Sequence, residues 1–504
     1  MSILEKNIQA LLSGVNEPLG NKLLNFIQNK TCSRFNIDEN LNIFDKTHNV
    51  FMYENLEEEI NFFYQSILEK TPRYPFICIY GIGNALLIKN LAKHYKHLFV
   101  FESEIELFIL ALSTIDLSEE LCSGKIYLVD IEEERVDIQL LILFDMKDMF
   151  EYLSLYEMFV NNSFYKQFCE KTWCETDEFC KKNIEIVIRD SGLNSNLSFQ
   201  SYFHFLQNIP SMLESIPFQR ILSQRKNKFD NAIVVSAGPS LAKQLPLLKA
   251  CQDKAVIFCA DGALSMLEKE GIVPDYVTNL DFTDLAMKFF QNKENKTSLN
   301  ILSCATHPNV AHSLKAENCM IVLRNKALYQ RFNFNDFGYI DTGTHVSHFS
   351  YTLALALGFK NIIMIGQDLA FDEEGNSHSK GFDFGEKFSG EENIDKLKIP
   401  AYAGKGEVLT HTTWNDYRIK LEYLFACNDQ KAKFYNATEG GARINFTEEL
   451  SFKECCEKLL TKFKPKFELP KSLTKNRSDK LLVKFKEKIQ KDQENAKRFL
   501  DDAL

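Results

Sequence analysis

Residues 231–249 read NAIVVSAGPSLAKQLPLLK, and this stretch decides which fold the chain adopts. Residues 233–235 form a β-branched apolar run, which is typical of a strand that is buried on both faces. The next residues break the strand, because Gly238 permits a tight turn while Pro239 and Ser240 suit the first positions of a helix. Such a turn presents N–H groups above the sheet, where they bind an anion, typically phosphate. The turn alone is equally typical of an ordinary strand–helix connection.

Length, charge and cysteine content restrict the class of protein. A chain of 504 residues is too long for one core and predicts two to four domains. Its net charge of −10 argues against nucleic-acid binding. The N-terminal residues MSILEKNIQALLSG carry charges, and no apolar run reaches membrane-spanning length, so we expect a cytoplasmic protein that does not bind a membrane. Thirteen cysteines without a C-x-x-C motif are expected to be free thiols.

Strand-like and helix-like patterns divide the chain into three regions. Residues 1–200 open with helical patterns and continue with strand-like runs such as PFICIYGIG. Residues 201–445 have a helical lead-in to about residue 227 and then alternate strands with helices, which predicts βαβ units. Residues 446–504 are helical and basic, which is typical of a solvated tail or of a docking surface for an acidic partner. The sequence predicts an α/β protein with two tandem Rossmann-like units, mostly parallel sheets and a helical C-terminal region.

The first unit has a glycine turn of its own. Gly81 and Gly83 follow a strand, and Glu102 ends the next strand 21 residues after Gly81. This layout matches a dinucleotide or methyl-donor site, in which a carboxylate binds ribose hydroxyls. Leu86 stands where the third glycine of that motif belongs, so the pattern favours a Rossmann-like unit without a cofactor.

Polar residues follow successive strands of the second unit. They are the Gly238-Pro239-Ser240 turn, Asp261, Asn279, Asp281, Thr342, Gly343, Gln367 and Asp368. Ligands of an open parallel sheet bind beyond the carboxyl ends of its strands, so we expect these residues to face one crevice. The crevice would then provide backbone amides that bind a phosphate, and carboxylates and amides that bind a ribose and a base. This combination indicates a nucleotide ligand.

Four segments of this region resemble the motility accessory factor family. They are AGPSL at 237–241, DGALSMLEKEGIVPD at 261–275, GFKNIIMIGQDLAF at 358–371 and NATEGGARI at 436–444. The likeness covers about residues 228–445 in order and spacing, and extends more weakly to the N-terminal unit. The family comprises bacterial flagellin glycosyltransferases whose central domain is similar to bacterial sialyltransferases.

The resemblance implies an activity and a set of binding residues. The implied reaction moves a nonulosonic acid, of the pseudaminic or legionaminic type, from its CMP-activated form to Ser or Thr hydroxyls of flagellin, in support of flagellar assembly and motility. The implied nucleotide-sugar-binding residues are Gly238, Pro239, Ser240, Asp261, Asn279, Asp281, Thr342, Gly343, Gln367 and Asp368. The family commonly reads Gly-Gly-Ser-Val where this chain reads Gly343-Thr344-His345-Val346, so this histidine either contacts the substrate or packs.

Such a transfer needs a base that removes the proton of the acceptor hydroxyl, and hydrogen-bond donors that stabilise the negative charge of the departing phosphate. The related sialyltransferases use a histidine that precedes a helix near the end of the domain. His411, in LTHTTWNDYRI, stands at the similar position and is the predicted catalytic base, with His345 and His378 as competitors. Arg418 and Arg443 either meet the sugar carboxylate or form surface ion pairs.

No organic cofactor is expected, and no residue is assigned to a metal. Asp281 and Asp284 either bind a divalent cation or, as their spacing favours, cap the following helix. The expected partners are flagellin and the CMP-activated nonulosonic acid, with self-association as a further expectation.

Two other functions are open at this point. A family of archaeal 6-hydroxymethylpterin pyrophosphokinases is similar across the same central domain. A non-catalytic flagellin-binding factor that kept a nucleotide fold would show the same motifs. The N-terminal unit and the basic C-terminal helices favour the transferase, because the pterin enzymes resemble the central region alone.

Overall fold

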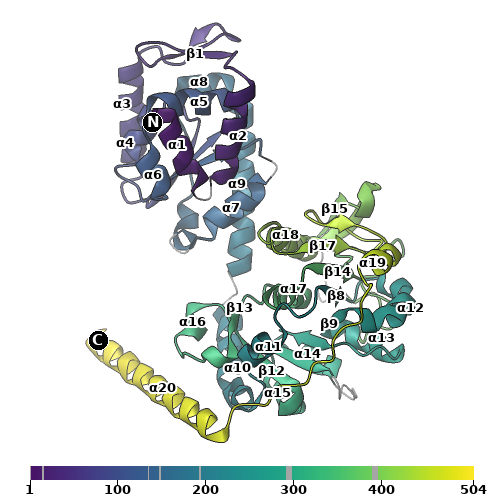
Figure 1. The fold of residues 1–504 in the computed structure, drawn as a ribbon. Helices are drawn as coiled ribbons and strands as arrows, with labels where there is room; N and C mark the ends of the chain where they lie inside the picture. The colour runs from purple at the N-terminus through teal and green to yellow at the C-terminus, as the bar shows by residue number, and fades with distance from the viewer. Residues whose placement is uncertain are drawn as a thin grey trace. The chain divides into compact units, whose positions relative to one another are not determined.

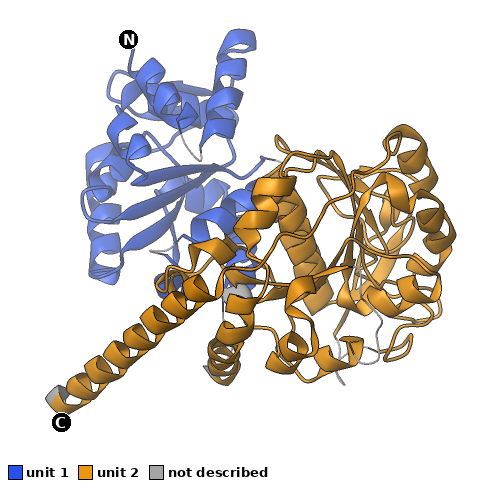
Figure 2. Cartoon of the chain, turned by 60° about the horizontal axis from the view of Figure 1, so that its bottom comes forward, with its two compact units in different colours: residues 1–192 blue, residues 193–504 orange. Residues whose placement is uncertain are grey.

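The structure is a computed structural model that describes residues 2–13, 16–133, 135–146, 149–191, 195–290, 298–388 and 395–503. The chain divides into two compact units, residues 1–192 and 193–504 (Figure 2). Each unit has a parallel sheet with helices on its faces (Figure 1), which confirms the predicted α/β class with two Rossmann-like units. Residues 446–504, which the sequence predicts as a region of their own, are grouped with the second unit.

Unit 1 is built on a four-stranded parallel sheet with the order β6-β5-β4-β7. Its strands are β4 (Phe76–Tyr80), β5 (His97–Glu102), β6 (Ile126–Asp130) and β7 (Met158–Val160). Every residue of β4 is buried, as expected for a central strand with helices on both faces. A separate antiparallel sheet contains β1 (Phe35–Ile37), β2 (Ile43–Asp45) and β3 (Val50–Phe51).

Tyrosine side chains fill the space around the glycine turn of unit 1. The Tyr165 ring, from α8 (Ser163–Phe168), lies so close to Gly81 that a Cβ there would be 2.3 Å from a ring carbon. The Tyr165 hydroxyl donates to Glu102 Oε2 at 2.6 Å and accepts from the Gly83 N–H at 3.1 Å. Glu102 also accepts from the backbone N–H groups of Ser103 and Glu104. The turn and the carboxylate that a dinucleotide would use are thus bonded to groups of the protein itself.

Unit 2 is built on a nine-stranded sheet with the order β13-β12-β11-β10-β9-β8-β14-β17-β18. All neighbouring pairs in this sheet are parallel. The strands are β8 (Asn231–Val235), β9 (Val256–Ala260), β10 (Tyr276–Asn279), β11 (Leu299–Ser303), β12 (Cys319–Arg324), β13 (Tyr339–Ile340), β14 (Asn361–Ile365), β17 (Lys433–Asn436) and β18 (Glu448–Glu449). The direction of strand addition reverses between β8 and β14.

The apolar run at 233–235 has the burial that its composition predicts. Ile233 and Val235 belong to one hydrophobic cluster and Val234 to another, so the two faces of β8 pack against different layers of helices. Helix α12 (Leu241–Cys251) follows the turn. The helix begins at Leu241, with Ser240 as its N-cap residue, so Pro239 lies before the helix and not in its first turn. The predicted strand–turn–helix is otherwise confirmed.

The C-terminal region is helical at both ends and extended in between. Helix α19 (Phe452–Lys458) and the long α20 (Lys475–Ala503) are joined by a segment without regular structure. In that segment, the Lys464 ammonium lies 2.6 Å from Asp275. The first half of α20 packs against α10 (Ser195–Glu214) through Phe485, whose ring meets that of Phe205 at 6.5 Å. In the part of the chain that the structure describes, no helix has both the length and the apolar character needed to cross a membrane.

The unit 2 core should be sensitive to the loss of one central ring. Phe258 of β9 is fully buried, and its ring stacks on Tyr276 with centroids 4.7 Å apart. Phe258→Ala should lower the free energy of unfolding by about 3–5 kcal/mol, because it leaves a cavity. Urea unfolding followed by fluorescence measures this change in a W173F background, where Trp414 is the remaining tryptophan.

Phe463→Ala is the control for this measurement, because that side chain is 76% exposed and its removal creates no cavity. A Phe258→Ala protein with the same unfolding midpoint as the control would contradict the burial of Phe258 in the core.

Candidate functional site

The centre of the site is the place where β8 and β14 end side by side. The chain leaves β8 toward α12 and leaves β14 in the other direction, so the two connections diverge above the sheet. A hydrogen bond from the Gly238 N–H to the Gly366 carbonyl, at 2.8 Å, holds the two exits together. Open α/β sheets bind ligands at such a reversal of strand order.

A cavity of about 210 Å³ lies at this reversal. Backbone segments that follow the strands surround it, together with a histidine and four aromatic side chains. They are residues 236–238, 260–262, 345–347 and 366–369, with His378, Phe289, Phe382, Trp414 and Tyr417. Polar groups from the strand ends and aromatic rings that can stack on a flat ligand therefore border the same small space, which we call the small cavity.

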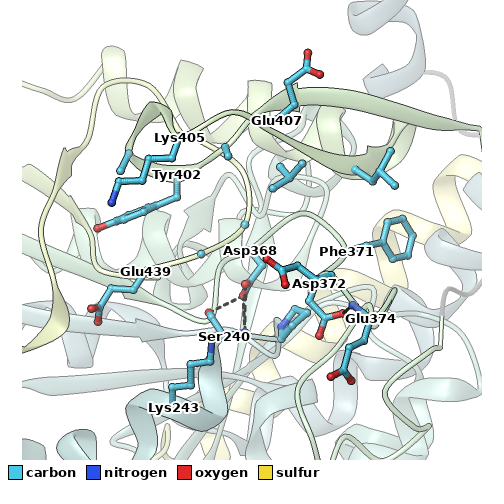
Figure 3. Close-up of a pocket in the computed structure, with 18 of the residues that line it drawn as sticks. Ser240, Lys243, Asp368, Phe371, Asp372, Glu374, Tyr402, Lys405, Glu407 and Glu439 are labelled. Atoms are coloured by element: carbon cyan, nitrogen blue, oxygen red, sulfur yellow. Dashed lines mark hydrogen bonds between the residues drawn. The ribbon is translucent and has the colours of Figure 1, made fainter.

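A second cavity of about 980 Å³ lies next to the first, and we call it the large cavity (Figure 3). It lies between the start of α12, the segment after β14 and the hairpin of β15 (Lys396–Pro400) and β16 (Glu407–His411). In Figure 3, Lys405, Tyr402 and Glu439 lie on one side of Asp368, and Asp372 and Glu374 lie on its other side. Asp368 borders both cavities.

The turn after β8 and Asp368 form one hydrogen-bonded unit. The Ser240 N–H donates to Asp368 Oδ1 at 3.2 Å and Oδ2 at 3.3 Å, and the Ser240 hydroxyl donates to Oδ2 at 2.8 Å. The N-terminal end of α12, which we predict to bind a phosphate, is thus occupied by a carboxylate of the protein. Burial raises the pKa of Asp368 to about 7.

Glycines make this contact sterically feasible. A Cβ at Gly238 would lie 2.1 Å from Asp368 Oδ2 and 2.5 Å from the Gly366 carbonyl oxygen. A Cβ at Gly441, which has a φ of +72°, would lie 2.4 Å from the Asp368 Cα. The backbone therefore approaches Asp368 from two sides at distances that only glycine permits.

Asp261 follows β9 and lies in a second polar contact of the small cavity. Its carboxylate accepts from the Asn279 side-chain amide and, at 2.7 Å, from the Gly262 N–H. Burial raises the pKa of Asp261 to about 7, against the lowering effect of these bonds. Among the described residues, Asn279 Oδ1 has no hydrogen-bond partner although it is buried.

The remaining predicted binding residues have different positions relative to the two cavities. Gln367 borders the small cavity, where its Oε1 accepts from Ser236 Oγ at 2.9 Å and Tyr351 OH at 3.3 Å. Asp281, Thr342 and Gly343 lie outside the lining of both cavities. The Asp281 carboxylate accepts from the Thr283 N–H at 2.8 Å, a local turn contact before α14 (Leu285–Phe290). Asn279 and Pro239 are adjacent to the site, the first through Asp261 and the second in the wall of the large cavity.

The three candidate histidines have different surroundings. His411 is buried outside both cavity linings and packs on Trp414, with ring centroids 4.1 Å apart. His345 and His378 both border the small cavity. The His378 ring stacks on Phe382 at 3.9 Å, and burial lowers its pKa to about 4. The roles of these residues stay predictions.

Some site features were not anticipated from the sequence. Trp414 and Tyr417 border the small cavity from α18 (Thr412–Ala426), three and six residues after His411. The chain has only two tryptophans, and one of them, Trp414, stands three residues after the predicted base; this position was a signal for the aromatic wall. Lys243, Lys405 and Tyr402 of the large cavity gave no signal, because their spacing along the chain is irregular. Arg418 pairs with Glu422 at 2.5 Å and borders neither cavity. No group of three or more potential metal ligands is found within the described ranges.

Gly238 and Gly440 both lie close to Asp368, so alanine substitutions at the two positions should separate a steric clash from the effect of adding a methyl group as such. Gly238→Ala places a methyl group against the Asp368 carboxylate and the Gly366 backbone, so we expect a lower melting temperature and a disordered Ser240–Asp368 contact. Gly440→Ala is the matched control, since its Cβ would lie 3.6 Å from Asp368 Oδ1, an ordinary contact distance. Differential scanning calorimetry of both variants tests this. Equal melting temperatures for the two variants would contradict the close packing at Gly238.

The raised pKa of Asp368 predicts a pH dependence of stability. A free aspartate has a pKa of about 4, so between about pH 4 and 7 the folded state holds a proton that the unfolded chain has released. The stabilisation from this group is complete below about pH 4 and is lost as the pH rises to about 7.

Urea unfolding of wild type and D368N at pH 5 and pH 8 measures this effect. We expect the free energy of unfolding of wild type, relative to D368N, to fall between the two pH values. Asp261 titrates in both proteins, so its contribution cancels. A relative stability that stays constant or rises would show that the pKa of Asp368 is not raised in the folded protein.

Two comparisons with known proteins found a similarity, one over the central part of the chain and one over almost its whole length. Residues 203–374 match the family model described as 6-hydroxymethylpterin diphosphokinase MptE-like. A solved structure, that of the MAf glycosyltransferase from Magnetospirillum magneticum AMB-1, matches with a TM-score of 0.48 and 17% sequence identity. The match covers 96% of this chain and 77% of that chain. No curated protein matches the chain. The MptE-like model also covers motility accessory factor-like proteins, so the central part of unit 2 is similar to the family that its sequence motifs resemble.

Proposed function

We propose that this chain is a glycosyltransferase that transfers a nonulosonic acid from a CMP-activated donor to Ser or Thr hydroxyls of flagellin. The observation that carries the proposal is the pair of cavities at the β8–β14 reversal, which share Asp368 as a common wall. Two substrates that meet at one reacting carbon need two adjoining spaces with a titratable group between them. CMP, the nonulosonic acid and flagellin come from the sequence resemblance.

The small cavity suits the nucleoside part of the donor. Trp414 and Tyr417 offer rings for stacking on a base, and Asp261 offers a carboxylate for its polar edge or for the ribose. Its volume of about 210 Å³ is below the range of roughly 300–1,000 Å³ for whole-ligand pockets. The sugar of the donor would therefore extend past Asp368 into the large cavity.

Asp368 is the group that best meets the needs of the reaction. A general base works best with a pKa near the working pH, and burial raises the pKa of Asp368 to about 7. In the proposed step the acceptor oxygen attacks the anomeric carbon, its proton passes to the Asp368 carboxylate, and the bond to the CMP phosphate breaks. His411, the base predicted by the resemblance, packs against Trp414 and is in the lining of neither cavity.

The large cavity has a charge pattern that bears on the acceptor. Its acidic residues outnumber its two lysines, Lys243 and Lys405, and include Asp372, Glu373, Glu374, Glu407 and Glu439. An acceptor segment with neutral or basic residues around its hydroxyl would bind there more favourably than an acidic one. The size of the cavity is compatible with a polypeptide loop.

A pterin diphosphokinase is the second candidate, because the matching family model carries that description. The buried carboxylate of Asp261 is suited to the amino-pyrimidinone edge of a pterin, which presents adjacent N–H donors. This function also needs ATP beside the pterin. The acidic walls of the large cavity oppose the several charges of a triphosphate more strongly than the single carboxylate of a nonulosonic acid, and this is the physical reason to rank the transferase first.

Ligand binding by wild type separates the two functions. We expect CMP to raise the melting temperature, because a ligand that binds the folded state stabilises it by mass action, whereas ATP and 6-hydroxymethyl-dihydropterin should have no effect. D261N should weaken CMP binding by roughly tenfold through the loss of a charged hydrogen-bond acceptor. D284N is the control, since that side chain is 98% exposed.

Transfer is then tested by mass spectrometry of flagellin incubated with the protein and a CMP-nonulosonate. A mass increase equal to one sugar residue per modified site is the expected result. Stabilisation by pterin and ATP, with none by CMP, would replace the transferase with the diphosphokinase. CMP binding with no sugar transfer by wild type would indicate a non-catalytic flagellin-binding factor.

A further inference from the structure

His345 is one of the two residues, with Thr344, at which this chain departs from the Gly-Gly-Ser-Val pattern of the family it resembles. It is the N-cap residue of α17 (Val346–Ala356) and borders the small cavity. Its Nδ1 accepts from the His348 N–H at 3.3 Å and lies 2.9 Å from Ser347 Oγ. The histidine thus caps the helix with one ring nitrogen and has the other available.

The capping contact determines which ring nitrogen carries the proton. A backbone N–H can only donate, so Nδ1 must be the unprotonated nitrogen. The Ser347 hydroxyl can rotate and donate to the same atom. A neutral His345 therefore has its proton on Nε2. Burial, with a smaller effect from His348, lowers the pKa of His345 well below its ordinary value, so the ring stays neutral at physiological pH.

The Nε2–H has no partner among the described residues although the atom is buried. The ring itself is held in place, since it stacks on Tyr417 with centroids 4.6 Å apart and an interplanar angle of 30°. A buried donor without an acceptor costs free energy, and a ligand acceptor in the cavity would remove that cost.

The ligand group that fits best is an anionic oxygen. The first turn of α17 borders the small cavity through Val346 and Ser347, and the N-terminal end of a helix favours negative charge. The corresponding end of α12 is already bonded to Asp368. In a nucleotide donor, the anionic group next to the nucleoside is the phosphate.

We propose that His345 is a donor-binding residue whose neutral Nε2–H hydrogen-bonds to the phosphate of the nucleotide in the small cavity. The inference rests on the proposed function for the identity of the nucleotide. It makes the segment before α17, rather than the turn after β8, the phosphate-binding element, and it gives His345 a role in holding the phosphate as it departs.

Two substitutions separate the two ring nitrogens. In H345N, the asparagine Oδ1 takes the place of Nδ1 and keeps the cap, but no donor takes the place of Nε2. In H345Q, the longer amide can place an N–H near the position of Nε2, whereas the cap is lost. Calorimetric titrations with CMP and with cytidine measure the phosphate contribution for each protein.

We expect H345N to bind CMP roughly 10- to 100-fold more weakly than wild type, with the affinity for cytidine unchanged. H345Q should keep more of the CMP affinity and should have the lower melting temperature of the two. H345N that binds CMP as tightly as wild type would overturn the inference alone. Wild type that does not bind CMP would overturn the inference together with the proposed function.

An NMR measurement tests the tautomer without any ligand. In protein labelled with [15N]histidine, the His345 signals are identified by their absence in H345N. We expect the pattern of an imidazole protonated at Nε2 and unprotonated at Nδ1 at pH 7. An Nδ1–H tautomer, or an imidazolium ring, would overturn the inference even if CMP binds.

Discussion

The buried carboxylate of Asp368 is the group on which the arrangement of the site depends. It is held between the turn after β8, through the Ser240 N–H and hydroxyl, and the glycine pair 440–441 after β17. Removing a carboxylate from water costs free energy unless donors surround it, so these two segments must keep their positions. Because both cavities border Asp368, their common wall is fixed by the same contact that joins the strand ends.

The two units share one sequence pattern but differ in whether it leaves space for a ligand. Each has a glycine turn after a buried strand and a carboxylate beyond a neighbouring strand. In unit 1 the Tyr165 ring and hydroxyl occupy the space between Gly81 and Glu102, so the turn is satisfied from within. In unit 2 a carboxylate satisfies the turn, and cavities remain on both sides of it. What differs is the size of the side chain that reaches the turn, and this side chain comes from a distant part of the sequence.

Helix N-termini show the same dependence on distant partners. The start of α12 was the predicted anion site, and an anion is indeed bound there, but it is Asp368. The start of α17 borders the small cavity, where His345 provides both the cap and a further donor. The positive end of a helix attracts negative charge wherever it lies, and whether a protein carboxylate or a ligand supplies that charge depends on which loop crosses it. The proposed role of His345 follows from this difference between the start of α12, which Asp368 occupies, and the start of α17, which borders the small cavity.

The α/β class, the parallel strands and the strand–turn–helix at 231–249 could be predicted from the sequence, because burial on two faces and tight turns are encoded by neighbouring residues. So could the meeting of Gly238, Asp261, Gln367 and Asp368 at one edge of the sheet. Packing between distant segments brings Ser240 into a hydrogen bond with Asp368, 128 residues away. It also places His411 against Trp414 and outside the small cavity, which His345 borders. Strand order brings residues to an edge, but the direction of each side chain depends on packing between segments that are far apart in the chain, and local patterns do not contain that information.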